Sequence, residues 1–158
     1  MPEFLKLTPP EEALAIWMAQ LPIRLESEVI PTERSLGRVT YSAVTASQPL
    51  PAFNRSTVDG YAVRAENTHG ASEALPAYLS LVGEIPMGQS ASIVLQDGQC
   101  ALIHTGGMLP QGANAVVMLE NTQSARPGEI ETLRAVASGE NTLKIGEDVS
   151  VGEQVIPA

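Results

Sequence analysis

Cysteine and basic residues are scarce in this sequence of 158 residues, and each scarcity excludes a class of protein. The one cysteine, Cys100, allows neither an intrachain disulfide nor a thiolate metal cluster, which favours a reducing cytoplasm. Nine Lys and Arg against eighteen Asp and Glu give a formal net charge of -9, which repels the phosphates of nucleic acids. We therefore expect a cytoplasmic protein that does not bind nucleic acid.

Aromatic residues and long apolar runs are scarce as well. No stretch reaches the roughly eighteen consecutive apolar residues of a membrane span, and Met1–Lys6 lacks the features of an export signal. One Trp, three Tyr and two Phe leave most of the core to aliphatic side chains. Cys100 lies in the apolar run Cys100–Ile103 with no cation beside it, so we expect a buried hydrophobe and not a nucleophile. No membrane partner is expected.

One amphipathic helix is predicted near the N-terminus. Thr8 is expected to cap it, with the Pro9-Pro10 pair in the first turn and Glu11 closing a capping box. Four apolar side chains then recur at i, i+3, i+4 and i+7, namely Leu14, Trp17, Met18 and Leu21. Pro22 ends the run, and we expect Trp17 to anchor the core.

The segment after the helix carries weaker signals. Residues 23–46 mix turns with short strand-like fragments around Glu28–Ile30 and Arg38–Tyr41. The prolines of Pro49–Phe53 force an extended backbone. This last stretch is therefore expected to be a linker into a second unit.

Short strand-like runs follow one another from Asp59 to about Leu133, each bounded by Gly, Pro, Asn or Asp. They cover Tyr61–Val63, Tyr78–Val82, Ser92–Leu95, Cys100–Ile103, Ala115–Met118 and Ile130–Leu133. This spacing is typical of a small barrel or sandwich and not of a parallel sheet with crossover helices. A further strand-like pattern, Val151–Ile156, stops at Pro157-Ala158, and we expect the protein to continue beyond it.

The Asp59-Gly60 pair is the first candidate for chemistry. It stands between the polar residues Asn54–Thr57 and a strand-like run, where glycine permits a tight turn that leaves the carboxylate exposed. Such a loop carboxylate can act as a ligand. Aspartate also commonly hydrogen-bonds the backbone of its own turn, and the residues alone favour that structural role.

A second candidate, His104-Thr105-Gly106-Gly107, follows the run Cys100–Ile103. Its two glycines allow backbone N–H groups to approach an anion, and Thr105 adds a hydroxyl donor. A plain turn at the end of a strand explains the same residues, because they form neither a phosphate loop nor a dinucleotide fingerprint. His69 is too distant along the chain to predict a metal site with His104.

Acidic residues recur in turns, and two or three that converge would form an oxygen-only site suited to Mg²⁺. They are Asp59, Asp97, Glu120, Glu140, Glu147 and Asp148. Solvated loop tips explain the same charges, so the sequence leaves both possibilities open. We find neither a supported Ser-His-Asp order nor a lysine beside a glycine-rich loop, so the sequence lacks a complete catalytic set.

Taken together, five stretches resemble the MoeA family of molybdopterin molybdenumtransferases, whose animal counterpart is the E domain of gephyrin. They are Pro49–Val63, Val82–Ile85, Ile103–Gly106, Leu109–Glu120, and Gly139–Asn141 continuing through Gly146–Val149. The resemblance depends on their order and spacing over nearly the whole chain, and Asn54–Val63 carries most of it.

The resemblance implies a mainly β fold with a few helices, made of the first two domains of the family. A small β-barrel-like or sandwich-like domain, residues 48–142, would be inserted in a discontinuous α+β domain of residues 1–47 and 143–158. The pterin-binding and C-terminal domains would lie outside these residues. The family's cleft combines the β-rich domain of one subunit with the pterin-binding domain of the other, so a homodimer is expected.

The implied activity is the insertion of molybdate into adenylylated molybdopterin, with Mg²⁺-dependent release of AMP. Molybdopterin adenylyltransferase is an expected upstream partner. By the motif match, Asp59 and Thr105 are expected to be catalytic, and Asp59 is also the expected Mg²⁺ ligand. Gly106, Ser56 and Asp148 are expected to bind substrate, although a structural role for Asp148 is equally compatible with the match.

Two positions depart from the family's pattern. Gly107-Met108 replaces the usual Ala-Pro, which could loosen the turn that positions Thr105, and Asn114 replaces an acidic residue. Because the substrates are anions and this chain is acidic, the cationic groups must come from a metal or from other domains, and the chain alone is expected to be inactive. The alternative is a scaffold or oligomerisation module, like the gephyrin E domain, without a catalytic role.

Overall fold

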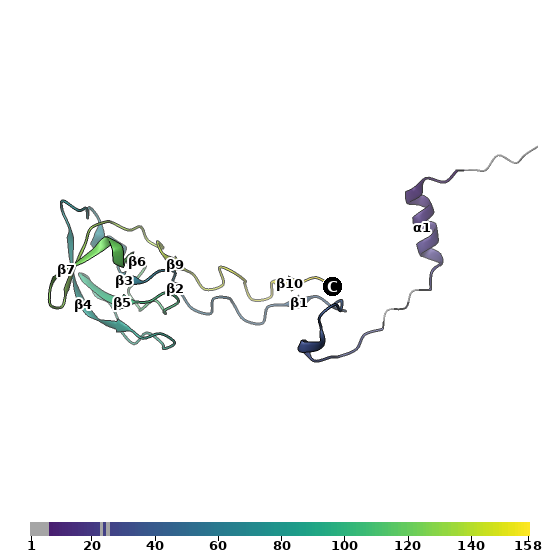
Figure 1. Ribbon diagram of the computed structural model, residues 1–158, viewed down its shortest axis with the longest axis horizontal. Helices are drawn as coiled ribbons and strands as arrows, with labels where there is room; N and C mark the ends of the chain where they lie inside the picture. Colours follow the sequence, from purple (N-terminus) through teal and green to yellow (C-terminus); the bar gives the residue numbers. More distant parts are fainter. Residues whose placement is uncertain (1–6, 23, 25) are drawn as a thin grey trace, which may run out of the picture. The chain divides into compact units, whose positions relative to one another are not determined.

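The computed structural model describes residues 7–22, 24 and 26–158, which form two compact units. The first comprises the described residues up to Tyr41, and the second comprises Ser42–Ala158. The first contains the helix α1 (Pro10–Gln20) and the 3-10 turn η1 (Thr32–Arg34). Every strand found in the described residues lies in the second unit (Figure 1).

The predicted helix is present as α1, but the prediction of its cap is wrong. Pro9 is the N-cap residue, with φ -52° and ψ 144°, and no side chain caps the amides of the first turn. Because the helix begins at Pro10, Thr8 lies one residue too early for its hydroxyl to act as the cap. The other end is as predicted, since Leu21 is extended in front of Pro22.

The apolar side chains of α1 do not form a core. Trp17 is 60% exposed, and no residue of α1 is buried. The prediction that Trp17 anchors the core is therefore wrong for this chain. Helical periodicity places side chains on one face, but another element must cover that face before it is buried.

The strand-like fragments at Glu28–Ile30 and Arg38–Tyr41 are not strands. A strand needs a neighbour for its backbone N–H and C=O groups, and the described part of the first unit provides no such neighbour. The strand that forms near this region is β1 (Val44–Thr45). Ile23, where the region begins, lies outside the described residues.

The second unit is built on one six-stranded sheet. Its strands are β3 (Gly60–Val63), β4 (Ala77–Ile85), β5 (Gln99–Ile103), β6 (Ala115–Met118), β7 (Thr122–Arg126) and β8 (Glu129–Thr132). They lie in the order β6-β3-β5-β4-β8-β7, and all neighbours are antiparallel except β4 and β5. The sheet curls into a half-barrel (Figure 1), so the predicted mainly β, barrel-like fold is confirmed.

Five of the six predicted strand-like runs form strands of this sheet. The exception is Ser92–Leu95, where Val94 makes a single bridge to Gln111. β7 was not predicted, because its residues are polar and mostly exposed at the edge of the sheet. Two 3-10 turns, η2 (Ala65–Thr68) and η3 (Leu119–Asn121), join strands to the following segments.

Both faces of the central strands are buried, as aliphatic side chains alternate between two clusters. One cluster includes Val63, Cys100 and Val117, and the other includes Ala62, Ala101 and Val116. Cys100 is 0% exposed, and burial raises the pKa of its thiol to about 12. The prediction that Cys100 is a buried hydrophobe is confirmed.

Short antiparallel pairings join the segment before the sheet to the segment after it. They are β2 (Arg55–Ser56) with β9 (Thr142–Leu143), β1 with β10 (Gln154–Ile156), and the single bridge Leu50 to Val149. The predicted linker, Pro49–Phe53, is thus paired with the returning chain. The division into residues 1–47 with 143–158, and residues 48–142 between them, stays a prediction.

Candidate active site

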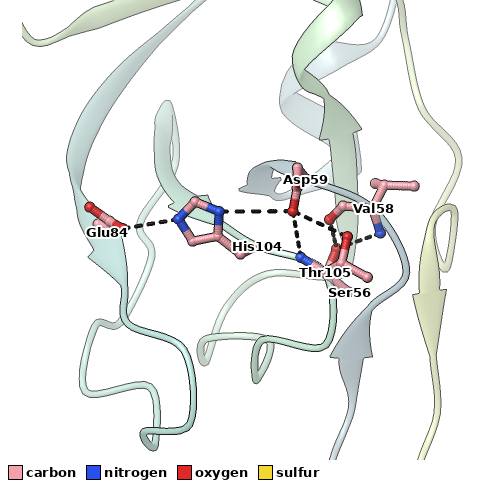
Figure 2. A network of polar contacts seen from close by, with 6 residues as sticks. All are labelled: Ser56, Val58, Asp59, Glu84, His104 and Thr105. Atoms are coloured by element: carbon pink, nitrogen blue, oxygen red, sulfur yellow. Dashed lines mark hydrogen bonds and ion pairs between the residues drawn. The ribbon is translucent and has the colours of Figure 1, made fainter.

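The pairing of β3 with β5 brings Asp59 and Thr105 together. Gly60 at the start of β3 lies opposite Ile103 at the end of β5. The residues just beyond them therefore meet at the same end of these two neighbouring strands. Oδ1 of Asp59 accepts hydrogen bonds from the Thr105 backbone N–H at 2.7 Å and from the Thr105 hydroxyl at 3.1 Å (Figure 2). The carboxylate therefore bonds a residue 46 positions away and not its own turn.

These contacts stabilise the charged form of the Asp59 carboxylate. The pKa of Asp59 is lowered, first by the Thr105 backbone N–H, then by the Thr105 hydroxyl, with a smaller contribution from His104. The other oxygen, Oδ2, has no hydrogen bond or ion pair with any residue that the structure describes. The Asp59 side chain is 56% exposed, so solvent reaches the carboxylate.

Gly60 is required because β6 approaches β3 very closely at this point. A Cβ atom on Gly60 would lie 2.0 Å from the carbonyl oxygen of Val117 and 3.0 Å from a side-chain carbon of Val116. Any larger residue would force β6 away from β3. The glycine of the Asp-Gly pair thus maintains the strand pairing that positions the carboxylate.

Backbone hydrogen bonds of Ser56 and Gly106 join the segment before Asp59 to the turn that carries Thr105. The Gly106 N–H donates to the Ser56 carbonyl at 2.8 Å, and the Ser56 N–H donates to the Gly107 carbonyl at 3.0 Å. The buried Ser56 Oγ donates to the Val58 carbonyl at 2.6 Å (Figure 2). Both predicted substrate-binding groups therefore have protein partners in this conformation, and their role toward substrate stays a prediction.

The turn that carries Thr105 is closed by a hydrogen bond from the Gly107 N–H to the His104 carbonyl at 2.8 Å. A Cβ atom on Gly107 would lie 2.9 Å from that carbonyl oxygen and 2.9 Å from a side-chain carbon of Ile103. Glycine in place of the usual alanine is therefore compatible with a tight turn here.

Two further residues, His104 and Glu84, belong to the same network; the sequence analysis named His104 only within a candidate turn and gave Glu84 no role. The Nε2 atom of His104 lies 3.0 Å from Oε1 of Glu84, and its Nδ1 atom lies 3.8 Å from Oδ1 of Asp59 (Figure 2). Only the order of the strands could have revealed this, because β5 lies between β3 and β4 in the sheet although it follows both of them in the chain.

The comparisons with known proteins identify the family. Residues 8–158 match the MoeA N-terminal region (domain I and II). This chain belongs to the MoeA family. The predicted resemblance is thus confirmed over nearly the whole sequence.

Relatives of this MoeA-family chain are longer proteins. It is 36% identical over 134 residues to the molybdopterin molybdenumtransferase of Bacillus subtilis (strain 168), covering 83% of this chain and 31% of that protein. It is 32% identical over 145 residues to the molybdopterin molybdenumtransferase of Nostoc sp. (strain PCC 7120), covering 84% of this chain and 33% of that protein. The chain thus spans about a third of the length of these relatives.

The fold of this MoeA-family chain is also that of a solved relative. The crystal structure of the molybdopterin biosynthesis moeA protein from Pyrococcus horikoshii OT3 superimposes with a TM-score of 0.87 at 37% identity. The match covers 96% of this chain and 40% of the Pyrococcus chain.

Asp148 is not part of the Asp59 network in this MoeA-family chain. Its Oδ2 atom lies 3.7 Å from the guanidinium of Arg55, and its backbone N–H donates to the Leu50 carbonyl at 3.0 Å. These contacts tie Asp148 to the paired segments that precede β3. Whether it also binds substrate stays a prediction.

Asn114, which replaces an acidic residue of the family's pattern, has structural contacts. Its side-chain oxygen accepts the Ala65 N–H at 2.7 Å, and its side-chain nitrogen donates to the Glu66 carboxylate at 3.1 Å. The amide therefore fixes η2 against the segment before β6.

A metal site with three or more protein ligands is not found in the part of this MoeA-family chain that the structure describes. No group of three or more His, Cys, Asp or Glu residues there is arranged to hold a metal ion. A cleft of about 520 Å³ is lined by residues between Ser138 and Glu147 and does not include Asp59. A ligand at Asp59 would therefore be bound partly by groups outside this network.

No helix among the described residues of this MoeA-family chain is both long enough and apolar enough to span a membrane.

Proposed function

We propose that this chain is the N-terminal part of a molybdopterin molybdenumtransferase, and that Asp59 and Thr105 form one side of its active site. The substrates would be molybdate and adenylylated molybdopterin, and AMP would be released. One observation carries the proposal: the charged Asp59 carboxylate is held through Oδ1 by Thr105, while Oδ2 has no partner among the described residues. The activity named for the relatives supports the substrate class.

A magnesium ion is compatible with the residues at this site. Mg²⁺ commonly takes one or two carboxylates and completes its coordination with water and substrate phosphates. The charged Asp59 with its unpartnered Oδ2 supplies one such ligand. When bound, the ion would offset negative charge on the phosphates as AMP leaves.

Thr105 would orient the Asp59 carboxylate through two hydrogen bonds, which also lower the pKa of that carboxyl. Ser56 and Gly106 keep the Thr105 turn fastened to the segment before Asp59. Ser56 and Gly106 would then contribute to substrate binding through the shape of the turn.

The positive charge that anionic substrates need would come from outside this chain. Within residues 42–158 the basic residues are Lys144 and four arginines, and each arginine forms an ion pair with a carboxylate: Arg55, Arg64, Arg126 and Arg134. This supports a site completed by a second copy of the full-length protein in a homodimer. The exposed apolar side chains of α1, including Trp17, are available for contacts in such an assembly. Molybdopterin adenylyltransferase would supply the adenylylated substrate.

The test is the variant Asp59→Asn in the full-length protein. We expect molybdenum insertion and AMP release to fall by about 100-fold or more, because the charged oxygen is lost where charge must be stabilised. Glu73→Gln, which neutralises an exposed carboxylate that has no hydrogen bond or ion pair with the residues of the site, is the matched control and should retain full activity. Thermal unfolding should be unchanged in both variants.

Two outcomes would contradict the proposal. Full insertion activity in Asp59→Asn would favour a scaffold or oligomerisation module without a catalytic role. Molybdenum insertion by the 158-residue chain alone would refute the inference that its site is incomplete.

A further inference from the structure

His104 lies between two carboxylates that belong to neighbouring strands. Glu84 is in β4, His104 follows β5, and Asp59 precedes β3, so the imidazole spans the edge of three adjacent strands (Figure 2). The motif match to the family assigns roles to Asp59 and Thr105 but none to this histidine.

The two contacts of the imidazole differ in kind. The 3.0 Å separation between Nε2 and Oε1 of Glu84 is a hydrogen-bond distance, whereas the 3.8 Å separation between Nδ1 and Oδ1 of Asp59 is too long for one. Glu84 therefore anchors the ring, and the anchored ring faces Asp59 with its Nδ1 edge. At 34% exposure the His104 side chain is also partly enclosed by its surroundings.

Every protein group that approaches the Asp59 carboxylate does so at the same oxygen. The Thr105 N–H, the Thr105 hydroxyl and Nδ1 of His104 all face Oδ1, and the residues that the structure describes leave Oδ2 without a contact. The two hydrogen bonds from Thr105 and the nearby Nδ1 atom of His104, 3.8 Å away, together limit the rotation of the carboxylate about its Cβ–Cγ bond. The other oxygen then points in a defined direction.

We propose that His104, anchored by Glu84, is a positioning residue that holds Asp59 with Oδ1 turned inward and Oδ2 presented to the ligand. This inference rests on the proposed role of Asp59. Thr105 lies on one side of Oδ1 and His104 on another, so removing the imidazole leaves the hydrogen bonds of Thr105 but frees the carboxylate to tilt. Residues that orient a reacting or ligating group in this way commonly contribute about 10–100-fold to activity.

Two substitutions of similar size separate the two contacts of the ring. Asn places its side-chain nitrogen near the position of Nδ1, whereas Gln places its nitrogen near the position of Nε2. His104→Asn thus retains a donor toward Asp59, and His104→Gln retains one toward Glu84. His104→Ala removes both.

In the full-length protein we expect His104→Gln and His104→Ala to lower kcat for molybdenum insertion by about 10–100-fold while KM changes little. His104→Asn should restore most of kcat, which a merely structural role would not predict. Equal kcat values for the Asn and Gln variants, or unchanged kcat in the Ala variant, would overturn the inference. Thermal unfolding of each variant identifies any loss of kcat that comes from misfolding. If His104→Ala misfolds, the comparison of His104→Asn with His104→Gln still tests the inference.

The variant Asp59→Asn, measured in parallel, distinguishes the two proposals. If Asp59→Asn is fully active, the proposed function itself fails. If Asp59→Asn is inactive while His104→Ala keeps its kcat, only the positioning role of His104 is wrong.

Discussion

Replacing Gly60 with alanine should destabilise the second unit through a steric clash alone. The added Cβ would lie 2.0 Å from the Val117 carbonyl oxygen, so β6 must move by about 1 Å to restore even 3.0 Å. The obstacle is backbone in the middle of a paired strand, and it cannot rotate away as a flexible side chain would. The backbone of Gly60 is not in the left-handed region, so no conformational strain contributes.

The expected loss follows from these contacts. Overpacking commonly costs about 1–3 kcal/mol, and a rigid backbone obstacle places Gly60→Ala near 3 kcal/mol. The smaller conformational freedom of alanine in the unfolded chain offsets roughly 0.4–1 kcal/mol of this. With a urea m-value of about 2 kcal/mol/M, the midpoint should fall by about 1 M.

The assay is urea unfolding of the 158-residue chain followed by circular dichroism. Gly128→Ala is the matched control, because Gly128 has φ +80° and nothing within 4 Å of its added Cβ. It should lose about 1 kcal/mol from backbone strain without a clash. A Gly60→Ala midpoint at or above that of Gly128→Ala would refute the reasoning.

Two predictions concern ionisation in the same chain. The Asp59 carboxyl should titrate below 3.8 in a carbon-13 NMR experiment, and Thr105→Val should raise its pKa only part of the way, because the Thr105 N–H, the largest cause, remains. The pKa is depressed in the folded state, so the stability it contributes is present above the unfolded value and is lost as pH falls through the folded value. An unaltered chain that titrates at 3.8 or above would contradict this. Cys100, with its pKa raised to about 12 by burial, should resist alkylation at pH 8 in native buffer and react in urea. Equal labelling in both conditions would show that the thiol is accessible.

Several features could be predicted from the sequence because they depend on residues that are close together in the chain. Short apolar runs between Gly, Pro, Asn or Asp predicted five strands of the sheet, because strands that are buried on both faces need apolar side chains at successive positions. The isolated Cys100 in an apolar run predicted a buried thiol. The Pro9-Pro10 and Pro22 signals bounded α1 to within a residue or two, since proline acts on the backbone nearest to it.

The sequence could not predict what depends on pairing between distant segments. β7 has a polar edge-strand sequence, and Trp17 has helical periodicity without any cover, so neither burial nor pairing could be read from their patterns. The candidate site shows the same limit. Asp59 and Thr105 were found by their motifs, but their contact arises only because β3 lies beside β5.

Residue types and their spacing were enough to predict the mainly β fold, the family and the two residues at the centre of the candidate site. The folded chain was needed to show that Thr105 holds Asp59 through one oxygen, that Glu84 and His104 join the network, and that β6 leaves no room for a side chain at Gly60. The physical reason is that hydrogen bonds and close packing depend on distances across the sheet, which strand order sets and sequence separation conceals.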